Sequence, residues 1–309
     1  MIMTTPEKYS FTRYLAAKKS VDDRALNRQV WQALVEQIPT SSPVAPLRVL
    51  EIGAGIGTMI ERVWDWQLLT FSSYTALDAE MESVMVAWER LERWARQRPD
   101  IREILSGEDL VIHGDSCAME IRFLAGDLFD FIAIQPEPYD LLIANAFLDL
   151  VDIPAMLPKL FRLLKPGGLF YFSINFDGLT LFEPEIDSGF DAQVQALYHR
   201  TMDERIVDGK PSGDSRVGRH LFGLLQANGA EILQAGASDW VVFPGRAGYP
   251  EDEAYFLHFI IHTLHQALHA HPELDQQRFE QWIALRHAQV DRAELLYIAH
   301  QVDFAGRLR

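Results

Sequence analysis

Three alternating glycines follow a short apolar run near the start of the chain, in the stretch Val49-Leu50-Glu51-Ile52-Gly53-Ala54-Gly55-Ile56-Gly57-Thr58. The apolar run predicts a strand, and the glycines predict a tight turn into a helix. Because glycine has no Cβ atom, a nucleotide-like ligand can approach the backbone of such a loop closely. A dinucleotide-binding turn of the form G-x-G-x-x-G would need glycine at position 58, where Thr58 stands. The pattern is instead E-x-G-x-G-x-G.

Four further segments place acids, amides or a glycine turn beside predicted strands. In chain order they are Tyr74-Thr75-Ala76-Leu77-Asp78, Ala125-Gly126-Asp127-Leu128-Phe129, Tyr139-Asp140-Leu141-Leu142-Ile143-Ala144-Asn145-Ala146-Phe147 and Leu163-Leu164-Lys165-Pro166-Gly167-Gly168-Leu169-Phe170-Tyr171-Phe172. With the glycine loop, these segments resemble the class I S-adenosylmethionine-dependent methyltransferases. The resemblance implies S-adenosylmethionine as cofactor and in-line methyl transfer to a small-molecule acceptor.

The resemblance also assigns cofactor contacts residue by residue. The expected contacts are Gly53, Ala54, Gly55 and Gly57 at the methionine and sulfonium end, Asp78 and Ala79 at the ribose, Asp127 and Leu128 at the adenine, and Asn145, Ala146 and Phe147 on the sulfonium side. Glu51 is expected to act indirectly, by orienting the glycine loop or through water. The simpler alternatives are a plain turn for the glycines and Asn145, and a strand-end or helix-capping acid for the two aspartates.

The implied fold is a Rossmann-like, seven-stranded, mostly parallel sheet with helices on both faces, whose last strand is antiparallel. We expect an N-terminal helical cap (1–45) and a methyltransferase domain (46–309) with a helical insertion (251–291) between strands six and seven. Periodicity and turn signals predict helices within 8–37 and at 58–68, 80–97, 153–164, 190–206, 215–228, 252–270 and 273–290. The predicted strands are 47–51, 74–78, 110–113, 119–124, 139–144, 168–174, 231–243 and 294–300. Residues 175–213 are expected to form mainly a long binding loop.

Composition narrows the classes of partner. Lys and Arg number 28 against 44 Asp and Glu, and the net charge of −16 repels phosphate backbones, so nucleic acid is not expected. No apolar run approaches the roughly 20 residues of a membrane span. The lone Cys117 excludes an internal disulfide, and Met1 to Ser10 do not resemble a signal peptide, so we expect a cytoplasmic protein. A homodimer is left open.

The acceptor site is harder to recognise in the sequence than the cofactor site. Methyl transfer depends mainly on positioning the acceptor, so it does not require a characteristic catalytic residue. Asp177, in an Asn-Phe-Asp-Gly sequence after strand five, is a candidate base or amine-binding carboxylate, with an Asp-Gly turn as its alternative. Candidate acceptor-binding residues, each with a plain surface or packing role as its alternative, are Tyr9, Tyr14, Arg24, Asn175, Arg219 and Tyr255.

Histidines at 258, 262, 265 and 269 form a stripe on one predicted helix. Pairs spaced by four residues could bind a metal, but no third ligand is evident on the same face, so no metal is expected. His258 and His262 are instead candidate catalytic residues, with a solvated or interface stripe as the alternative.

Two other functions stay open from the sequence. One is a protein that binds S-adenosylmethionine without transferring its methyl group. The other, a nicotinamide-dependent oxidoreductase, is disfavoured by Thr58 and by the L-K-P-G-G turn. The acceptor atom, the use of a general base and the oligomeric state are not determined by these patterns.

Overall fold

A ten-stranded sheet forms the centre of the protein, in a computed structural model that describes residues 5–134, 137–207 and 209–309. In spatial order its strands are β10 (Ala230–Ala237), β12 (Leu296–Leu308), β7 (Leu164–Glu183), β6 (Tyr139–Asn145), β1 (Leu47–Ile52), β2 (Phe71–Asp78), β5 (Ala118–Ala125), β4 (Leu110–His113) and β3 (Glu103–Ser106). The tenth strand, β11 (Trp240–Val242), also pairs with β12. A separate small ribbon joins β8 (Ile206–Val207) and β9 (Lys210–Pro211).

The strand directions confirm a mostly parallel Rossmann-like sheet. The central pairs β1–β2, β1–β6, β2–β5 and β6–β7 are parallel, whereas β12 runs antiparallel to both β7 and β10. As predicted, the last strand, β12, is antiparallel and adjacent to β10. The sheet has more than the predicted seven strands: β4, expected at 110–113, and β3 extend one edge, and the expected strand 231–243 is divided into β10 and β11. The strand β3 was missed because it is only four residues long and its adjacent Ile104 and Leu105 do not alternate with polar residues.

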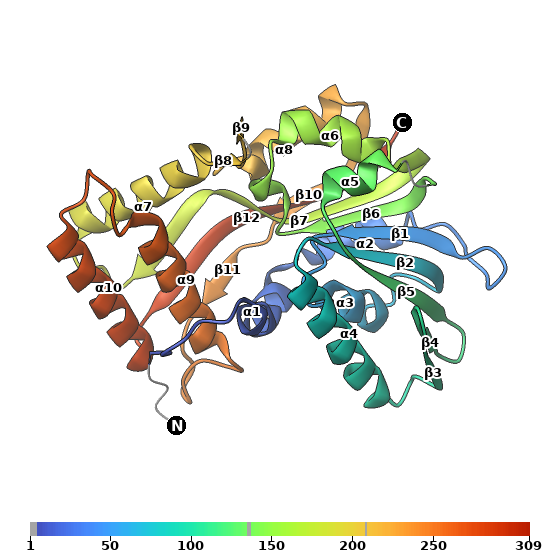
Figure 1. Ribbon diagram of the computed structural model, residues 1–309, viewed down its shortest axis with the longest axis horizontal. Helices are drawn as coiled ribbons and strands as arrows, with labels where there is room; N and C mark the ends of the chain where they lie inside the picture. Colours follow the sequence, from blue (N-terminus) through green and yellow to red (C-terminus); the bar gives the residue numbers. More distant parts are fainter. Residues whose placement is uncertain (1–4, 135–136, 208) are drawn as a thin grey trace.

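Helices cover both faces of this sheet (Figure 1). On one face lie α2 (Arg28–Val35), α3 (Thr58–Asp65) and α4 (Met81–Arg96), and on the other lie α5 (Leu128–Ala133), α6 (Ile153–Phe161) and α8 (Val217–Ala227). Side chains alternate between the two cores, as they must along a strand. On β7, Tyr171 belongs to the core beneath α2, and its neighbours Phe170 and Phe172 belong to the core beneath α8.

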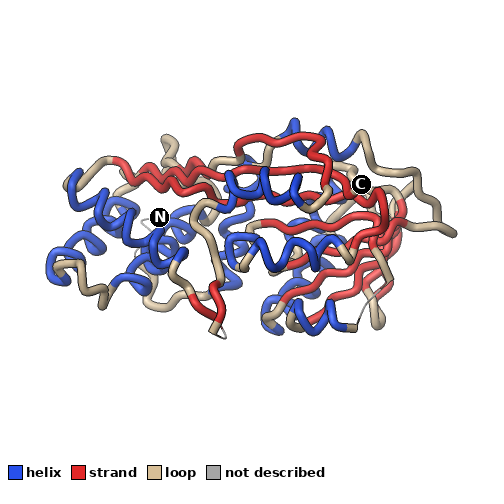
Figure 2. Tube along the Cα trace, turned by 90° about the horizontal axis from the view of Figure 1, so that it is seen from above, coloured by secondary structure: helices blue, strands red, loops and turns tan. Residues whose placement is uncertain are grey.

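Two strands continue far beyond the rest of the sheet and carry a helical lobe. Asn145, the last residue of β6, pairs with Ser173, but β7 continues to Glu183, paired with the first half of β12. Figure 2 shows these strands running into the lobe, where α7 (Ser188–Asp203), α9 (Glu253–Leu268) and α10 (Gln276–Asp291) pack. Between lobe and core lies α1 (Phe11–Ala25), which contacts α9, β11 and α4.

The long β7 corrects the predicted strand at 168–174 and the predicted loop after it. An Asp-Gly turn was the alternative to a catalytic Asp177, yet both Asp177 and Gly178 lie within β7. Gly178 has φ +74°, a conformation that glycine adopts without strain, so the strand passes this point and pairs again at Thr180 with Ala299. Strand seven likewise extends past the predicted residue 300 to Leu308.

Gly236 of β10 lies where a helix approaches the strand closely. The irregularity of β10 lies between Ile232 and Gln234, not at Gly236. A Cβ atom on Gly236 would stand 2.4 Å from Nδ2 of Asn27, the residue that caps α2. Glycine is therefore needed there because α2 approaches the strand closely.

Candidate active site

The glycine loop presents bare backbone at the carboxyl end of β1. Gly53, Gly55 and Gly57 all have left-handed backbone angles, with φ of 67°, 54° and 77°. A Cβ atom on Gly53 would stand 2.8 Å from the ring of Phe147, and one on Gly55 would stand 3.1 Å from Cδ1 of Leu15. Side chains from two other segments thus pack directly against this loop. Larger residues at these positions would push them away.

Hydrogen bonds join the glycine loop to the ends of β2 and β5. The Gly55 N–H donates to Oδ2 of Asp78 at 2.7 Å, and the Glu80 N–H donates to Oδ1 at 2.9 Å. The Gly126 N–H donates to the Asp78 carbonyl at 2.9 Å. Each carboxylate oxygen has a further lone pair, so Asp78 can still accept hydrogen bonds from a ligand.

The donor set at this edge fits S-adenosylmethionine. The N-cap of α3 is Gly57, which has no side chain to satisfy the N–H groups of the first helical turn. Uncapped N–H groups and the helix dipole favour a carboxylate, such as that of the methionine part of the cofactor. Asp78 offers acceptors for ribose hydroxyls. The glycine cradle, the free helix start and the acid therefore suit the three ends of such a molecule.

The loop after β6 is held in a strained conformation beside the glycines. Ala146 has φ +52°, which is unusual for a residue with a side chain, and its N–H donates to the Ser173 carbonyl at 2.9 Å. The Ser173 hydroxyl donates to Oδ1 of Asn145 at 2.8 Å. These contacts direct the chain so that Phe147 packs on Gly53.

The residues predicted for the adenine and outer ribose lie at the same edge. Asp127 is exposed and caps α5, where its Oδ1 accepts from the N–H of Phe129 at 2.7 Å. Leu128 is buried against the sheet, and Ala79 is exposed next to Asp78. Their contacts with the cofactor stay predictions.

Glu51 is a buried carboxyl beneath the glycine loop. It accepts a hydrogen bond from the Tyr74 hydroxyl at 2.8 Å, and burial raises its pKa to about 8. The carboxyl is therefore mainly protonated at neutral pH. This position suits the predicted indirect role, in which Glu51 orients the loop.

The three predicted catalytic residues face other protein groups. Asp177 accepts from the amide and from Nε of Arg219, each at 2.8 Å, so this pair joins β7 to the start of α8. His258 is fully buried, with Nδ1 2.8 Å from Nδ1 of His287 on α10. His262 stacks on the ring of Tyr9 at 4.0 Å. Across the described part of the chain, no group of three or more His, Cys, Asp or Glu could hold a metal ion.

Most of the predicted acceptor-binding residues hold α1 against α9. Tyr14 stacks on Phe259 at 4.2 Å, and Tyr255 accepts from the Ser10 N–H at 2.6 Å. Arg24 donates from Nη1 and Nη2 to the buried Glu253 carboxylate. Asn175 is buried between β7 and β12, where its Nδ2 donates to the carbonyls of Phe172 and Val302. Tyr9 and Arg219 have the contacts given above.

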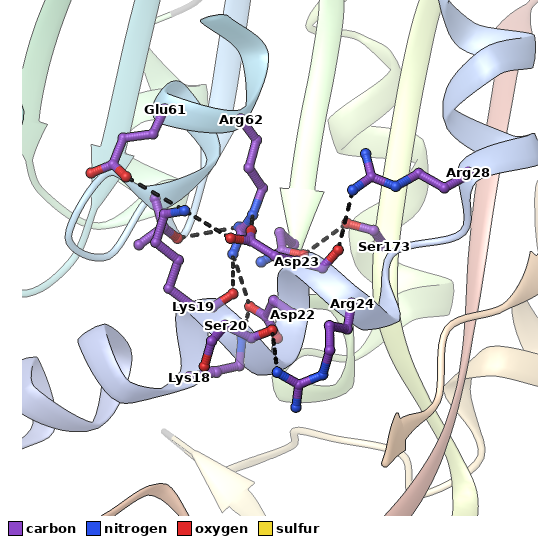
Figure 3. A network of polar contacts seen from close by, with 12 residues as sticks. Lys18, Lys19, Ser20, Asp22, Asp23, Arg24, Arg28, Glu61, Arg62 and Ser173 are labelled. Atoms are coloured by element: carbon purple, nitrogen blue, oxygen red, sulfur yellow. Dashed lines mark hydrogen bonds and ion pairs between the residues drawn. The ribbon is translucent and has the colours of Figure 1, made fainter. Parts of the chain in front are cut away.

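A polar network joins α1 to the core on its other side (Figure 3). Arg62 points from α3 toward α1, where its Nε lies 2.6 Å from Asp23 and its Nη2 lies 3.6 Å from Asp22. Lys19 lies 3.6 Å from Glu61. The helix is therefore fixed to both the lobe and the glycine-loop side of the core.

Sequence reasoning missed three polar residues that lie near Tyr14, itself one of the predicted acceptor-binding residues. We call Tyr14, Asp149, Tyr198 and Tyr297 the Tyr–Asp cluster. Asp149 lies in a short 3-10 helix, η1 (Leu148–Leu150), directly after the predicted cofactor segment. An acid two residues beyond Phe147 was the available signal. Tyr198 and Tyr297 had none, because only the folded lobe brings them near.

The family comparison agrees with this geometry. Residues 50–172 match the model of a family described as a methyltransferase domain. This range contains the ends of β1, β2, β5 and β6, which form the site. The matched segment is a class I S-adenosylmethionine-dependent methyltransferase domain.

Solved structures of methyltransferases are similar to this methyltransferase at low identity. One is an S-adenosylmethionine-dependent methyltransferase from Thiobacillus denitrificans in complex with S-adenosyl-L-homocysteine, with 13% identity, a TM-score of 0.46, and coverage of 99% of this chain and 100% of that chain. Another is the cyclopropane synthase MmaA2 from Mycobacterium tuberculosis, with 11% identity, a TM-score of 0.43, and coverage of 98% and 100%. No curated protein matches the chain. Likeness at this level does not define an acceptor.

The match to a methyltransferase domain and the donor set at the glycine loop are consistent with S-adenosylmethionine as the cofactor. In residues 5–134, 137–207 and 209–309, no helix is both long and apolar enough to cross a membrane.

Proposed function

We propose that this methyltransferase transfers a methyl group to a small molecule bound between α1 and the carboxyl ends of the central strands. The contact of Leu15 with Gly55 carries the proposal, because it places α1 directly over the glycine loop. The bound cofactor supplies a methyl group on a sulfonium that is already an excellent leaving group. The protein's main task is then to orient the acceptor and to exclude water.

The cofactor is held, in this proposal, by backbone and acids from four strand ends. Gly53, Gly55 and the start of α3 hold the amino-acid end, and Asp78 holds the ribose. Asp127 binds the adenine, and the strained turn at Ala146 shapes the sulfonium side. Glu51 supports the loop from below through its neutral carboxyl.

The position of α1 over the glycine loop favours a small acceptor. Both ends of α1 are tied down: Arg13 pairs with Asp252 at 2.8 Å, and Arg24 pairs with Glu253. A helix fixed in this way leaves less room for a macromolecule than an open sheet edge would. The net charge of −16 also repels nucleic acids.

Two measurements test the proposal. Isothermal titration should give binding of S-adenosylmethionine and S-adenosylhomocysteine but not of NADH. An acceptor screen with isotope-labelled S-adenosylmethionine, followed by product mass, should then identify a methylated small molecule. Binding without turnover on any acceptor would favour a cofactor-binding protein instead, and binding of NADH alone would overturn the assignment.

A further inference from the structure

Three tyrosine hydroxyls and one carboxyl from four different elements lack protein partners. Within the described residues, the hydroxyls of Tyr14, Tyr198 and Tyr297 make no hydrogen bond to protein. The Oδ1 atom of Asp149 is buried and also has no partner there. A buried polar atom is normally paired, so the unpaired Oδ1 of Asp149 indicates a ligand or water site, and the three hydroxyls nearby, which keep some exposure, are free to take part in it.

Shared neighbours hold the Tyr–Asp cluster together. Phe256 of α9 lies against both Tyr14, at a ring distance of 5.7 Å, and Tyr297, at 6.1 Å. Arg205 follows α7, the helix of Tyr198, and donates from Nη2 to the Asp149 carbonyl at 3.1 Å. Tyr198 itself lies close enough to Asp149 that this carboxyl, together with burial, raises the pKa of the phenol. Residues of α1, α7, β12 and η1 therefore meet at one place.

This place adjoins the predicted sulfonium side of the cofactor. Leu15, next to Tyr14, lies over Gly55, and Phe147, two residues before Asp149, lies on Gly53. An acceptor bound by the cluster would therefore lie beside the glycine loop.

The charged groups around the Tyr–Asp cluster favour a positively charged acceptor over a negatively charged one. Lys18 is paired with Asp22 at 2.8 Å, and Arg205 is engaged with the carbonyls of Asp149 and Ser212. Within the structurally described chain, the Asp149 carboxylate pairs with no cation. A carboxylate acceptor would meet this charge unfavourably, whereas an ammonium group would neutralise it.

The protonation states are compatible with a cation. Burial raises the pKa of Asp149, and a bound ammonium would lower it again by stabilising the carboxylate. Burial also raises the pKa of Tyr14 well above its usual value and that of Tyr198 to about 12. Both phenols thus stay neutral and can accept hydrogen bonds from an ammonium group.

We propose that the Tyr–Asp cluster binds the methyl acceptor and that the acceptor is a small amine, held as its ammonium by Asp149 and the hydroxyls of Tyr14 and Tyr198. This inference rests on the proposed function and deepens it. It assigns an acceptor-binding role to Asp149, Tyr198 and Tyr297, none of which the sequence singled out.

The test compares probes of one shape and different charge. The protein is saturated with S-adenosylhomocysteine and titrated by calorimetry with phenethylamine, 2-phenylethanol and phenylacetate, and then with butylamine, butanol and butyrate. We expect at least one amine to bind with a Kd of about 1 mM or tighter, and its alcohol and carboxylate counterparts to bind at least about tenfold more weakly.

Two variants and a control locate that binding. Asp149→Asn keeps the shape but removes the charge, and should weaken the amine roughly 10- to 150-fold. Tyr198→Phe should weaken it less, by about threefold to tenfold. Glu120→Gln makes the same chemical change at an exposed position of β5 and should leave the amine affinity unchanged. S-adenosylhomocysteine affinity and thermal midpoint should be unchanged in all three.

The outcomes separate this inference from the function on which it rests. Failure to bind S-adenosylhomocysteine overturns the proposed function itself. If S-adenosylhomocysteine binds normally, the proposed function stands and three results would overturn the amine site alone. These results are that no amine binds, that alcohols or carboxylates bind as tightly as amines, or that Asp149→Asn leaves amine affinity unchanged.

Discussion

The Cδ1 atom of Leu15 lies 3.1 Å from the point where a Cβ atom would stand on Gly55. Helix α1 and the glycine loop are therefore fitted to each other at a position where only glycine leaves room. Because the same glycine donates its N–H to Asp78, this contact couples the covering helix to the predicted ribose site.

Gly55→Ala should weaken cofactor binding for two separable reasons. An alanine at φ +54° costs about 1–2 kcal/mol of backbone strain, and its methyl group crowds Leu15. Titration with S-adenosylhomocysteine should give a weaker Kd for Gly55→Ala and partial recovery for the double variant Leu15→Ala/Gly55→Ala. Equal losses in the two variants would mean that strain alone matters and that α1 does not press on the loop.

The cofactor edge could be predicted because its signals are local. The glycine spacing, the acid at Asp78 and the strand before Asn145 each lie within a few residues, and the sheet then aligns their ends. The predicted long loop after strand five was wrong for a tertiary reason. Pairing with β12 carries β7 through Asp177 and Gly178, and no sequence window around these residues contains that partner.

The polar contacts of the lobe could not be inferred from residue types. Asp177 and Arg219 were proposed separately for the acceptor, and the structure pairs them with each other. Tyr198 and Tyr297 lie far apart in the sequence, on a helix and a strand that meet only once the lobe has formed. Identifying such clusters requires the fold.

Asp78→Asn should weaken S-adenosylhomocysteine binding by at least about tenfold, because charge-assisted hydrogen bonds of about 1.5–3 kcal/mol to the ribose would be lost. Asparagine keeps one acceptor oxygen for the loop N–H of Gly55, so the fold should survive. Asp130→Asn, on the exposed side of α5, is the matched control. A folded Asp78→Asn protein with wild-type affinity would contradict the ribose assignment.

Glu51 should make the cofactor-free protein less stable as pH rises. Its pKa is about 8 in the folded protein, against 4.5 for an unburied glutamate. Between these values the folded state holds a proton that the unfolded state has lost, so the free energy of unfolding falls with rising pH, by up to about 1.4 kcal/mol per pH unit. Urea unfolding of Glu51→Gln from pH 5 to 8 should lack this decline. An identical slope in both proteins would show that Glu51 titrates normally.

The histidine contact between α9 and α10 should fail in acid. Burial and the neighbouring His258, His262 and His265 lower the pKa of His287 to about 4, from 6.5. The unfolded state then binds more protons between these values, so stability is lost as pH falls from 6.5 toward 4. Asp291 lies 3.2 Å from Nε2 of His258 and acts against burial on the pKa of that histidine. Thermal unfolding of His287→Gln should depend less on pH in this window, and an unchanged dependence would contradict the prediction.

Replacement of Arg24 should show whether this residue stabilises the position of α1 or binds the acceptor. Its guanidinium is half exposed, but it pairs with Glu253, whose carboxylate is fully buried and also accepts from the Ser20 hydroxyl at 2.7 Å. Removing one partner of a buried ion pair typically costs about 3–5 kcal/mol, and the exposure of Arg24 should reduce this to about 1–3 kcal/mol. Arg24→Ala should therefore lower the thermal midpoint and increase hydrogen exchange in α1.

The double variant Arg24→Leu/Glu253→Leu should recover much of the lost stability, because it leaves no buried charge unpaired. A residue that binds the acceptor would behave differently. Its replacement would raise the acceptor KM at unchanged stability, and removing Glu253 as well would not restore that KM. Measuring both quantities for the single and double variants decides between the two roles, since α1 can serve as a fixed cover only if the Arg24–Glu253 pair is part of what holds it in place.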